Sequence, residues 1–398
     1  MRRLVALALI LSACTTTARP SPTPTAAESP SNAATASATA SPTPTPTATA
    51  ECAARVLATM TEEQRIGQLF LLGLANDQLG AAEQNAIRTY HFGSVWFVEQ
   101  SAAGAPTIRA VADATQGLAA ANTASVGFFV AANQEGGIIQ SLSGPGFSTI
   151  PSALDQSAID PATLRTSAAL WGRELASAGV NLNFAPVLDV VPPGTDAQNE
   201  PIGALQRGYG HDPVTVTAHA VAFMQGMEDA GIATTGKHFP GLGRVTGNTD
   251  FTAAVVDDVT TATDAYLAPF HDAIAIGIPM VMVALAKYQQ IDPTELAVFS
   301  PTIMRQMLRT SLGFTGVVVS DDLGATVAVA NIAPADRAIG FLLAGGDFII
   351  SKTVAPANAM ATAISARAST DAAFKTRVDD AALRIVRAKA ARGLVRCA

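Results

Sequence analysis

The chain has 398 residues, of which 49% are hydrophobic and 14% are charged, and its formal net charge is −7. This hydrophobic content is sufficient for one large domain or two small ones. The negative charge argues against a polyanionic partner, so we expect no nucleic acid binding.

Residues 1–13 have the features of a secretory leader. Arg2 and Arg3 precede the apolar run Leu4–Leu11, which is too short to span a bilayer as a mature helix. The run ends in LSAC, where small residues stand directly before Cys14. This ending resembles a bacterial lipobox, which implies lipidation of Cys14, removal of residues 1–13 as a lipoprotein signal peptide, and attachment to the outer face of the cell membrane. An ordinary signal peptide with an incidental cysteine is the alternative.

Residues 14–50 are almost wholly Thr, Ser, Pro and Ala. Such a segment has few large apolar side chains whose burial would offset the entropy of ordering, so we expect a flexible spacer. An O-glycosylated stalk has the same composition. Residues 51–398 then form the folded part of the chain.

Cys52 and Cys397 stand at the two ends of this folded part. If Cys14 carries lipid, they are the remaining cysteines of a protein in an oxidising compartment, and a disulfide between them is the natural inference. The bond requires the two ends of the domain to be neighbours in space, as in a closed barrel. Two unpaired thiols are the alternative, although exposed thiols are poorly tolerated outside the cell.

Short apolar runs alternate with helical patterns along the domain. The helical patterns often begin near Pro, Asp or Thr and end before a glycine. This alternation is typical of a parallel sheet that is buried on both faces, and eight units predict an α/β fold, namely a (β/α)8 TIM-type barrel with a single catalytic domain. A doubly wound open sheet is the rival, but no G-x-G-x-x-G motif follows the first run. The predicted strands are 67–73, 93–99, 126–133, 182–189, 232–239, 279–286, 315–322 and 346–352, and predicted helices are 161–178, 213–230, 261–276, 301–312 and 334–344.

Polar residues directly follow several of these apolar runs. Functional residues of a TIM barrel lie where its strands end, at the C-terminal face. One polar residue at a strand end is weak support because loops are polar in general, but several together indicate a site. They are 133–137 after the third run, Asp189 after the fourth, Lys237 and His238 in the fifth, and 320–322 after the seventh.

Five motifs occur in order along the domain: NQEGG at 133–137, NFAPVLDV at 183–190, RGYGHDP at 207–213, KHFPGLG at 237–243 and GFTGVVVSDDLGA at 313–325. Together they resemble glycoside hydrolase family 3, and most of all its single-domain β-N-acetylhexosaminidase branch. The resemblance extends from about residue 55 to 395. It implies a retaining exo-β-glycosidase that hydrolyses terminal N-acetylglucosamine from cell-wall-derived glycans.

The resemblance also implies roles for single residues. Asp321 matches the nucleophile, whose carboxylate attacks the anomeric carbon and forms a glycosyl-enzyme. Lys237 and His238 match ligands of sugar hydroxyls, and Arg207 matches an arginine that contacts the substrate. We also expect Asp189 to take part in substrate binding.

The chain departs from the branch in the loop after His238. The branch typically reads K-H-F-P-G-H-G, followed by D-S-H, whose Asp-His dyad is the general acid/base. Here Leu242 replaces the first loop histidine, and the dyad histidine is missing from Asn248-Thr249-Asp250. Asp250 is then the candidate acid, because an apolar closing loop raises the pKa of a carboxyl group. A surface-loop acid without a catalytic role is the alternative.

Asn133 replaces the branch's sugar-binding Asp ahead of QEGG, which changes the pattern of hydrogen-bond donors and acceptors. A β-glucosidase is therefore an alternative specificity. The missing dyad histidine and Asn133 also leave open a non-catalytic barrel that binds cell-wall sugar or a partner, whereas the retained Asp321, Lys237 and Arg207 favour an enzyme. We predict an extracytoplasmic, lipid-anchored, monomeric glycosidase with a carbohydrate substrate. We expect no cofactor and no metal, because the other histidines (91, 211, 219 and 271) lack ligand spacing.

Overall fold

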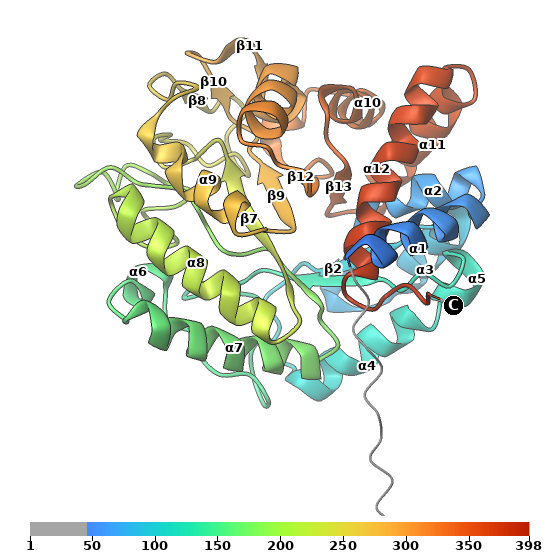
Figure 1. Ribbon diagram of the computed structural model, residues 1–398, viewed down its shortest axis with the longest axis horizontal. Coiled ribbons are helices and arrows are strands. Elements are labelled where there is room, and N and C mark those ends of the chain that lie inside the picture. The colour runs from blue at the N-terminus through green and yellow to red at the C-terminus, as the bar shows by residue number, and fades with distance from the viewer. Residues whose placement is uncertain (1–45, 398) are drawn as a thin grey trace, which may run out of the picture. The chain divides into compact units, whose positions relative to one another are not determined.

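The computed structural model describes residues 46–397. The predicted signal peptide, Cys14 and most of the predicted spacer lie outside this range. Eight parallel strands close into a barrel in the order β1-β13-β12-β9-β7-β6-β3-β2 (Figure 1). The predicted (β/α)8 barrel is thus confirmed. Its strands are β1 (Phe70–Leu74), β2 (Ser94–Phe97), β3 (Phe129–Ala132), β6 (Leu182–Asn183), β7 (Ala233–Phe239), β9 (Met280–Val283), β12 (Val317–Asp322) and β13 (Phe348–Ser351).

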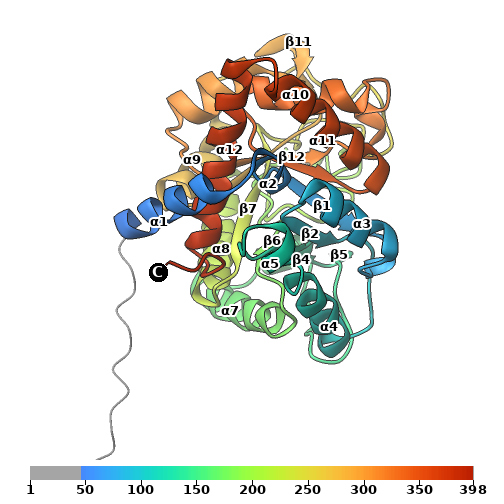
Figure 2. The same ribbon diagram turned by 90° about the vertical axis from the view of Figure 1, so that its right-hand side faces the viewer.

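Helices surround the barrel, and each barrel strand is followed by at least one of them (Figures 1 and 2). They are α1 (Pro46–Thr59), α2 (Glu62–Gln68), α3 (Ala81–Tyr90), α4 (Ala105–Gln116), α5 (Ala119–Asn122), α6 (Ala153–Gln156), α7 (Pro161–Ser177), α8 (Pro213–Asp229), α9 (Ala268–Ala275), the π-type helix η4 (Thr302–Ser311), α10 (Pro334–Ala344), α11 (Val354–Ala368) and α12 (Ala372–Ala390). Two small sheets lie in the loops outside the barrel. In one, β4 (Gln134–Gly136) pairs with β5 (Ile139–Gln140), and in the other, β10 (Lys287–Tyr288) lies between β8 (Val256–Asp257) and β11 (Asp292–Leu296).

The long helices begin where the sequence supplies a cap. Asp160 accepts hydrogen bonds from the first free backbone N–H groups of α7, and Asp212 does the same for α8. Each of these helices has a proline at its first position, where no backbone donor is needed. The helix predicted at 261–276 begins later than expected. Asp264 caps a 3-10 turn, η2 (Ala265–Leu267), and α9 follows it.

Two other boundaries differ from the sequence prediction. The run 182–189 pairs as a regular strand only over Leu182–Asn183, because Pro186 lacks the N–H that a ladder needs. Helix α1 begins at Pro46, so residues 46–50 are helical, whereas the sequence analysis placed them in the spacer. Between Pro46 and Arg396, no helix is long and apolar enough to cross a membrane.

The N-terminal ends of the strands are closed by buried charges. The Asp347 carboxylate, directly before β13, is fully buried and accepts hydrogen bonds from Arg309 at 2.5 Å, Arg377 at 2.7 Å and Arg384 at 3.2 Å. The buried Lys389 ammonium donates to the Gly93 carbonyl directly before β2 at 2.7 Å. These contacts fasten η4 and α12 beneath the barrel.

The two ends of the described chain meet. Cys52 in α1 and Cys397 form a disulfide with their Cα atoms 5.6 Å apart, which is the pairing that the sequence analysis expected. Helix α1 lies along α12, as Figures 1 and 2 show. The Gly127 amide, which precedes β3, donates to the Leu394 carbonyl. The C-terminal segment therefore runs along the N-terminal ends of the strands.

Candidate active site

A cavity of about 360 Å³ opens among the loops at the C-terminal ends of the barrel strands. It brings together six residues that the sequence analysis selected: Asn133, Arg207, Lys237, His238, Asp250 and Asp321. Apolar side chains, among them Trp96, Phe184, Leu242, Met282 and Ile350, complete its walls. Polar and charged groups that converge on a cavity with apolar walls are typical of a small-molecule site.

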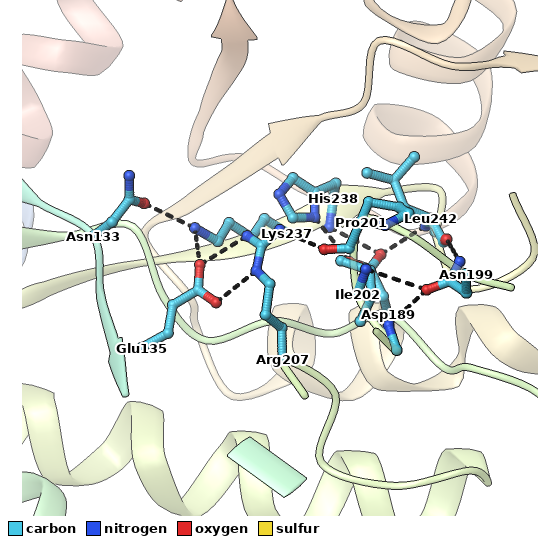
Figure 3. A network of polar contacts seen from close by, with 12 residues as sticks. Asn133, Glu135, Asp189, Asn199, Pro201, Ile202, Arg207, Lys237, His238 and Leu242 are labelled. Atoms are coloured by element: carbon cyan, nitrogen blue, oxygen red, sulfur yellow. Dashed lines mark hydrogen bonds and ion pairs between the residues drawn. The ribbon is translucent and has the colours of Figure 1, made fainter. Parts of the chain in front are cut away.

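Glu135 connects two of the cations in this cavity (Figure 3). Its Oε1 atom lies 2.5 Å from Lys237 Nζ and 2.8 Å from Arg207 Nη2, and its Oε2 atom accepts from Arg207 Nε at 2.9 Å. Lys237 also donates to Asn133 Oδ1 at 3.0 Å. Glu135 lies inside the NQEGG motif but was not among the predicted site residues; only its position between Lys237 and Arg207 in space reveals its part.

The charges of Glu135, Lys237 and Arg207 influence one another's pKa values. Burial alone would raise the pKa of Glu135, but Arg207 and Lys237 outweigh burial and lower it to about 2. Burial, together with Arg207, lowers the pKa of Lys237, and Glu135 opposes this change. The cluster therefore keeps its carboxylate ionised, and the lysine ammonium depends on that carboxylate.

Several donors of the cluster remain available to a ligand. Two of the three Lys237 N–H bonds have partners in Glu135 and Asn133, and three of the five Arg207 donors contact Glu135 or the Pro201 carbonyl. The Asn133 amide gives its oxygen to Lys237, so its NH₂ group is left for the cavity. The floor of the cavity can thus donate to several hydroxyl oxygens at once.

Asp189 does not line the cavity, contrary to the expectation that it binds substrate. It is fully buried behind His238, where its Oδ2 accepts from His238 Nδ1 at 2.8 Å and its Oδ1 accepts from the His238 and Leu242 amides at 3.1 and 2.8 Å (Figure 3). This contact holds the proton on Nδ1 and leaves His238 Nε2 as an acceptor toward the cavity. Asp189 is a positioning residue.

Lys237 and His238 are adjacent in β7 and both line the cavity, and the peptide bond between them is cis. The turn after β7 packs closely against the loop after β6. A Cβ atom at Gly243 would lie 1.8 Å from the Val190 carbonyl oxygen, so this position requires glycine. Asn199 donates to the carbonyls of Leu242 and Val245 at 2.7 Å each and thereby ties the loop before Arg207 to the same turn.

The two acids at the end of β12 have different surroundings. Asp321 lines the cavity, and its Oδ1 accepts from the Asp322 amide at 2.8 Å. Asp322 accepts backbone hydrogen bonds from Gly324 and Lys352 at 2.8 Å each and from Ala325 at 3.1 Å. Asp322 also lines the cavity, but three backbone amides occupy its carboxylate and fix the loop, whereas Asp321 has one such partner and is the freer acid.

Asp250 lies at the mouth of the cavity, in a turn with Asn248, which accepts from the Asp250 amide at 3.0 Å. The carbonyls of Thr249 and Asp250 accept from the amides of Ala328 and Val327 at 3.1 and 3.3 Å, so this turn is fastened to the loop after β12. In residues 46–397 the Asp250 carboxyl group accepts no hydrogen bond. Burial and the neighbouring Asp321 raise the pKa of Asp250, although Arg207 opposes them.

Comparison with known proteins identifies the family. The model of the glycosyl hydrolase family 3 N-terminal domain matches residues 61–388. The chain belongs to glycosyl hydrolase family 3. This confirms the resemblance in the five motifs, and the protein is accordingly a glycoside hydrolase with a carbohydrate substrate.

Several relatives and solved structures resemble the chain. A β-N-acetylhexosaminidase from Beutenbergia cavernae is 48% identical, with a TM-score of 0.82 over 83% of this chain and 99% of that one. A β-N-acetylglucosaminidase from Paenibacillus is 27% identical, with a TM-score of 0.76 over 85% of this chain and 64% of that one. A β-hexosaminidase from Xanthomonas euvesicatoria is 33% identical over 71% of this chain and 83% of the relative.

Proposed function

We propose that the protein is a retaining exo-β-N-acetylhexosaminidase that releases terminal N-acetylglucosamine from cell-wall-derived glycans. The observation that carries this proposal is the cavity that places the Asp321 carboxylate among Arg207, Lys237 and His238 at the C-terminal face. The name of the 48% identical Beutenbergia protein supports the same glycone.

Each of these cavity residues has its own role in the double-displacement reaction. Arg207, Lys237 and Asn133 donate to the hydroxyl oxygens of the terminal sugar, and His238 Nε2 accepts from one of its hydroxyl groups. Binding at several points orients the anomeric carbon toward Asp321. The Asp321 carboxylate attacks this carbon, the bond to the leaving-group oxygen breaks, and a glycosyl-enzyme forms that water then hydrolyses.

Asp250 is the proton donor in this proposal. It lies at the cavity mouth, on the side from which a leaving group departs, and no other hydrogen bond occupies its carboxyl group in the described part of the chain. Its raised pKa keeps it protonated at higher pH than an ordinary aspartic acid, and the ionisation of Asp321 favours this state. After departure of the leaving group, Asp250 takes a proton from the attacking water.

We also propose that lipid on Cys14 attaches the protein to the outer face of the membrane. The disulfide at Cys52 supports an oxidising compartment. The described chain begins with α1, which the disulfide holds near the N-terminal ends of the strands, and the cavity opens at their opposite ends. Palmitate labelling of the wild type and of Cys14→Ala in the native host tests the anchor.

The test of the activity compares aryl β-N-acetylglucosaminide with aryl β-glucoside as substrates. We expect turnover of the first with kcat/KM at least about tenfold higher than for the second, which corresponds to about 1.4 kcal/mol of discrimination. The matched control is Asp321→Asn, which should bind N-acetylglucosamine but not turn over either substrate. Preference for the glucoside would overturn the assigned glycone, and equal rates for the wild type and Asp321→Asn would overturn the enzyme assignment.

A further inference from the structure

Phe251 is an aromatic residue that the fold leaves in solvent. Its side chain is 79% exposed, and it is the only aromatic residue among the largely exposed hydrophobic residues of the region 46–397. Burial of a phenylalanine side chain normally contributes about 1.5–3 kcal/mol, so an exposed ring leaves this stabilisation unused in the free protein. Because this exposed ring lines the cavity, it is available to a molecule that binds there.

The backbone at Phe251 is held in place by hydrogen bonds to its neighbours in the chain. The Phe251 amide donates to the Asn248 carbonyl at 3.0 Å, and the amide of Thr252 donates to the same carbonyl at 2.8 Å. The turn is also fastened to the loop after β12, as described above for the carbonyls of Thr249 and Asp250. Phe251 therefore stands on an anchored turn, which lowers the entropy cost of using it for binding.

Phe251 lines the same cavity as Asp321 and directly follows Asp250 in the chain. The polar floor at Arg207 and Lys237 holds one sugar, and the leaving-group oxygen lies toward Asp250. A group attached to that oxygen then extends to the mouth of the cavity, where it meets the ring of Phe251.

The chemistry of the ring selects among leaving groups. A pyranose in its chair form carries hydroxyl groups around its edge and C–H bonds on its faces, so one face is apolar and nearly flat. A phenyl ring matches this face in size and shape. It offers no hydrogen bond to a flexible peptide, and its contact area with a short alkyl group is small.

We propose that Phe251 is the specificity-determining residue of a leaving-group subsite, where it stacks on a second pyranose ring. The preferred substrate is then a β-linked oligosaccharide. The inference rests on the proposed glycosidase activity. Phe251 contacts only the leaving group, so it acts before the glycosyl-enzyme forms and has no part in its hydrolysis.

The test uses two substrates that share the same glycone. N,N′-diacetylchitobiose has a sugar as its leaving group, and N-acetyl-β-glucosaminyl fluoride has a single atom. We expect Phe251→Ala to lower kcat/KM for the disaccharide about 5–10-fold, mainly through KM, and to leave the fluoride within about twofold. Phe251→Tyr keeps a flat ring and should retain the wild-type values.

Val259→Ala is the matched control, since Val259 is 56% exposed in the same region of the chain but does not line the cavity. An equal loss with both substrates for Phe251→Ala would show a defect in the glycone site or in the fold, and this would overturn the proposal. A loss in kcat for the disaccharide with unchanged KM would show that Phe251 only supports the acid Asp250, and this would also overturn it. Unchanged kinetics, or a change in oligomeric state with unchanged KM, would also overturn it. Failure of the proposed function is distinguishable, because the wild type itself would then turn over neither substrate.

Discussion

Replacement of Glu135 by Gln removes the carboxylate that lies between Lys237 and Arg207. The amide can accept a hydrogen bond, but it brings no negative charge, so two buried cations face each other without a counter-charge. A carboxyl group whose pKa falls from 4.5 to about 2 on folding contributes about 3 kcal/mol to stability at pH 7. Loss of one partner from a buried ion pair typically costs about 3–5 kcal/mol, in agreement with this value.

The pH dependence distinguishes this mechanism from a simple packing defect. The pKa of Glu135 is lower in the folded than in the unfolded state, so its contribution is complete above about pH 4.5 and is lost as the pH falls toward about 2. The difference in unfolding free energy between the wild type and Glu135→Gln should be about 3 kcal/mol at pH 7 and about 1 kcal/mol at pH 3.

Urea denaturation at the two pH values measures this difference. Glu200→Gln is the matched control, because Glu200 is exposed and accepts only the Asn248 amide at 3.1 Å; it should change stability by less than about 0.5 kcal/mol. A Glu135→Gln variant as stable as the wild type at pH 7, or a difference that is the same at both pH values, would refute the electrostatic account.

Three further perturbations have expected outcomes. Asp250→Asn should lower kcat for the disaccharide by about two to four orders of magnitude and should spare kcat/KM for substrates with activated leaving groups, because their glycosyl-enzyme forms with little acid assistance. It should also abolish the decline of activity that we expect in the wild type as rising pH deprotonates the Asp250 carboxyl group, and steady-state kinetics over pH 4–9 measures both effects. Cys52→Ser opens a covalent loop spanning a sequence separation of 345 residues and should destabilise the protein by about 3–5 kcal/mol with unchanged KM; a melting temperature insensitive to this change would contradict the structural role of the bond. Asp347→Asn removes the carboxylate shared by Arg309, Arg377 and Arg384 and should lower the free energy of unfolding by about 3–5 kcal/mol. Since Asp347 lies at the end of the barrel opposite the cavity, a folded variant that lost activity but kept its stability would contradict this role.

The sequence was informative where function follows from a position along a strand. Eight apolar runs alternating with capped helices predicted the barrel, because this periodicity has few other solutions in a chain of this length. Polar residues at strand ends then located Asp321, Lys237 and His238 on one face. The family resemblance added Arg207, which stands in a loop that periodicity alone does not place.

Contacts between distant segments were less predictable. Glu135 is separated from Arg207 and Lys237 by long stretches of chain, and only the closed barrel shows that it joins them. Asp189 looked like a site residue because it follows an apolar run, but the irregular segment after Pro186 places it behind His238. The pattern of apolar residues locates the end of a strand, but it does not show in which direction the irregular segment after it orients a side chain.

The central claim is that Asp321 is the nucleophile of a retaining glycosidase. Its most direct test is incubation of the protein with a 2-fluoro sugar that bears an activated leaving group, followed by intact mass measurement and peptide mapping. An activated leaving group needs little acid assistance, so the result does not depend on Asp250. The account predicts a covalent glycosyl adduct on Asp321 in the wild type and none in Asp321→Asn. Folded wild-type protein that gains no adduct from either the 2-fluoro gluco reagent or the matching 5-fluoro N-acetylglucosamine reagent, or gains it on another residue, would contradict the account.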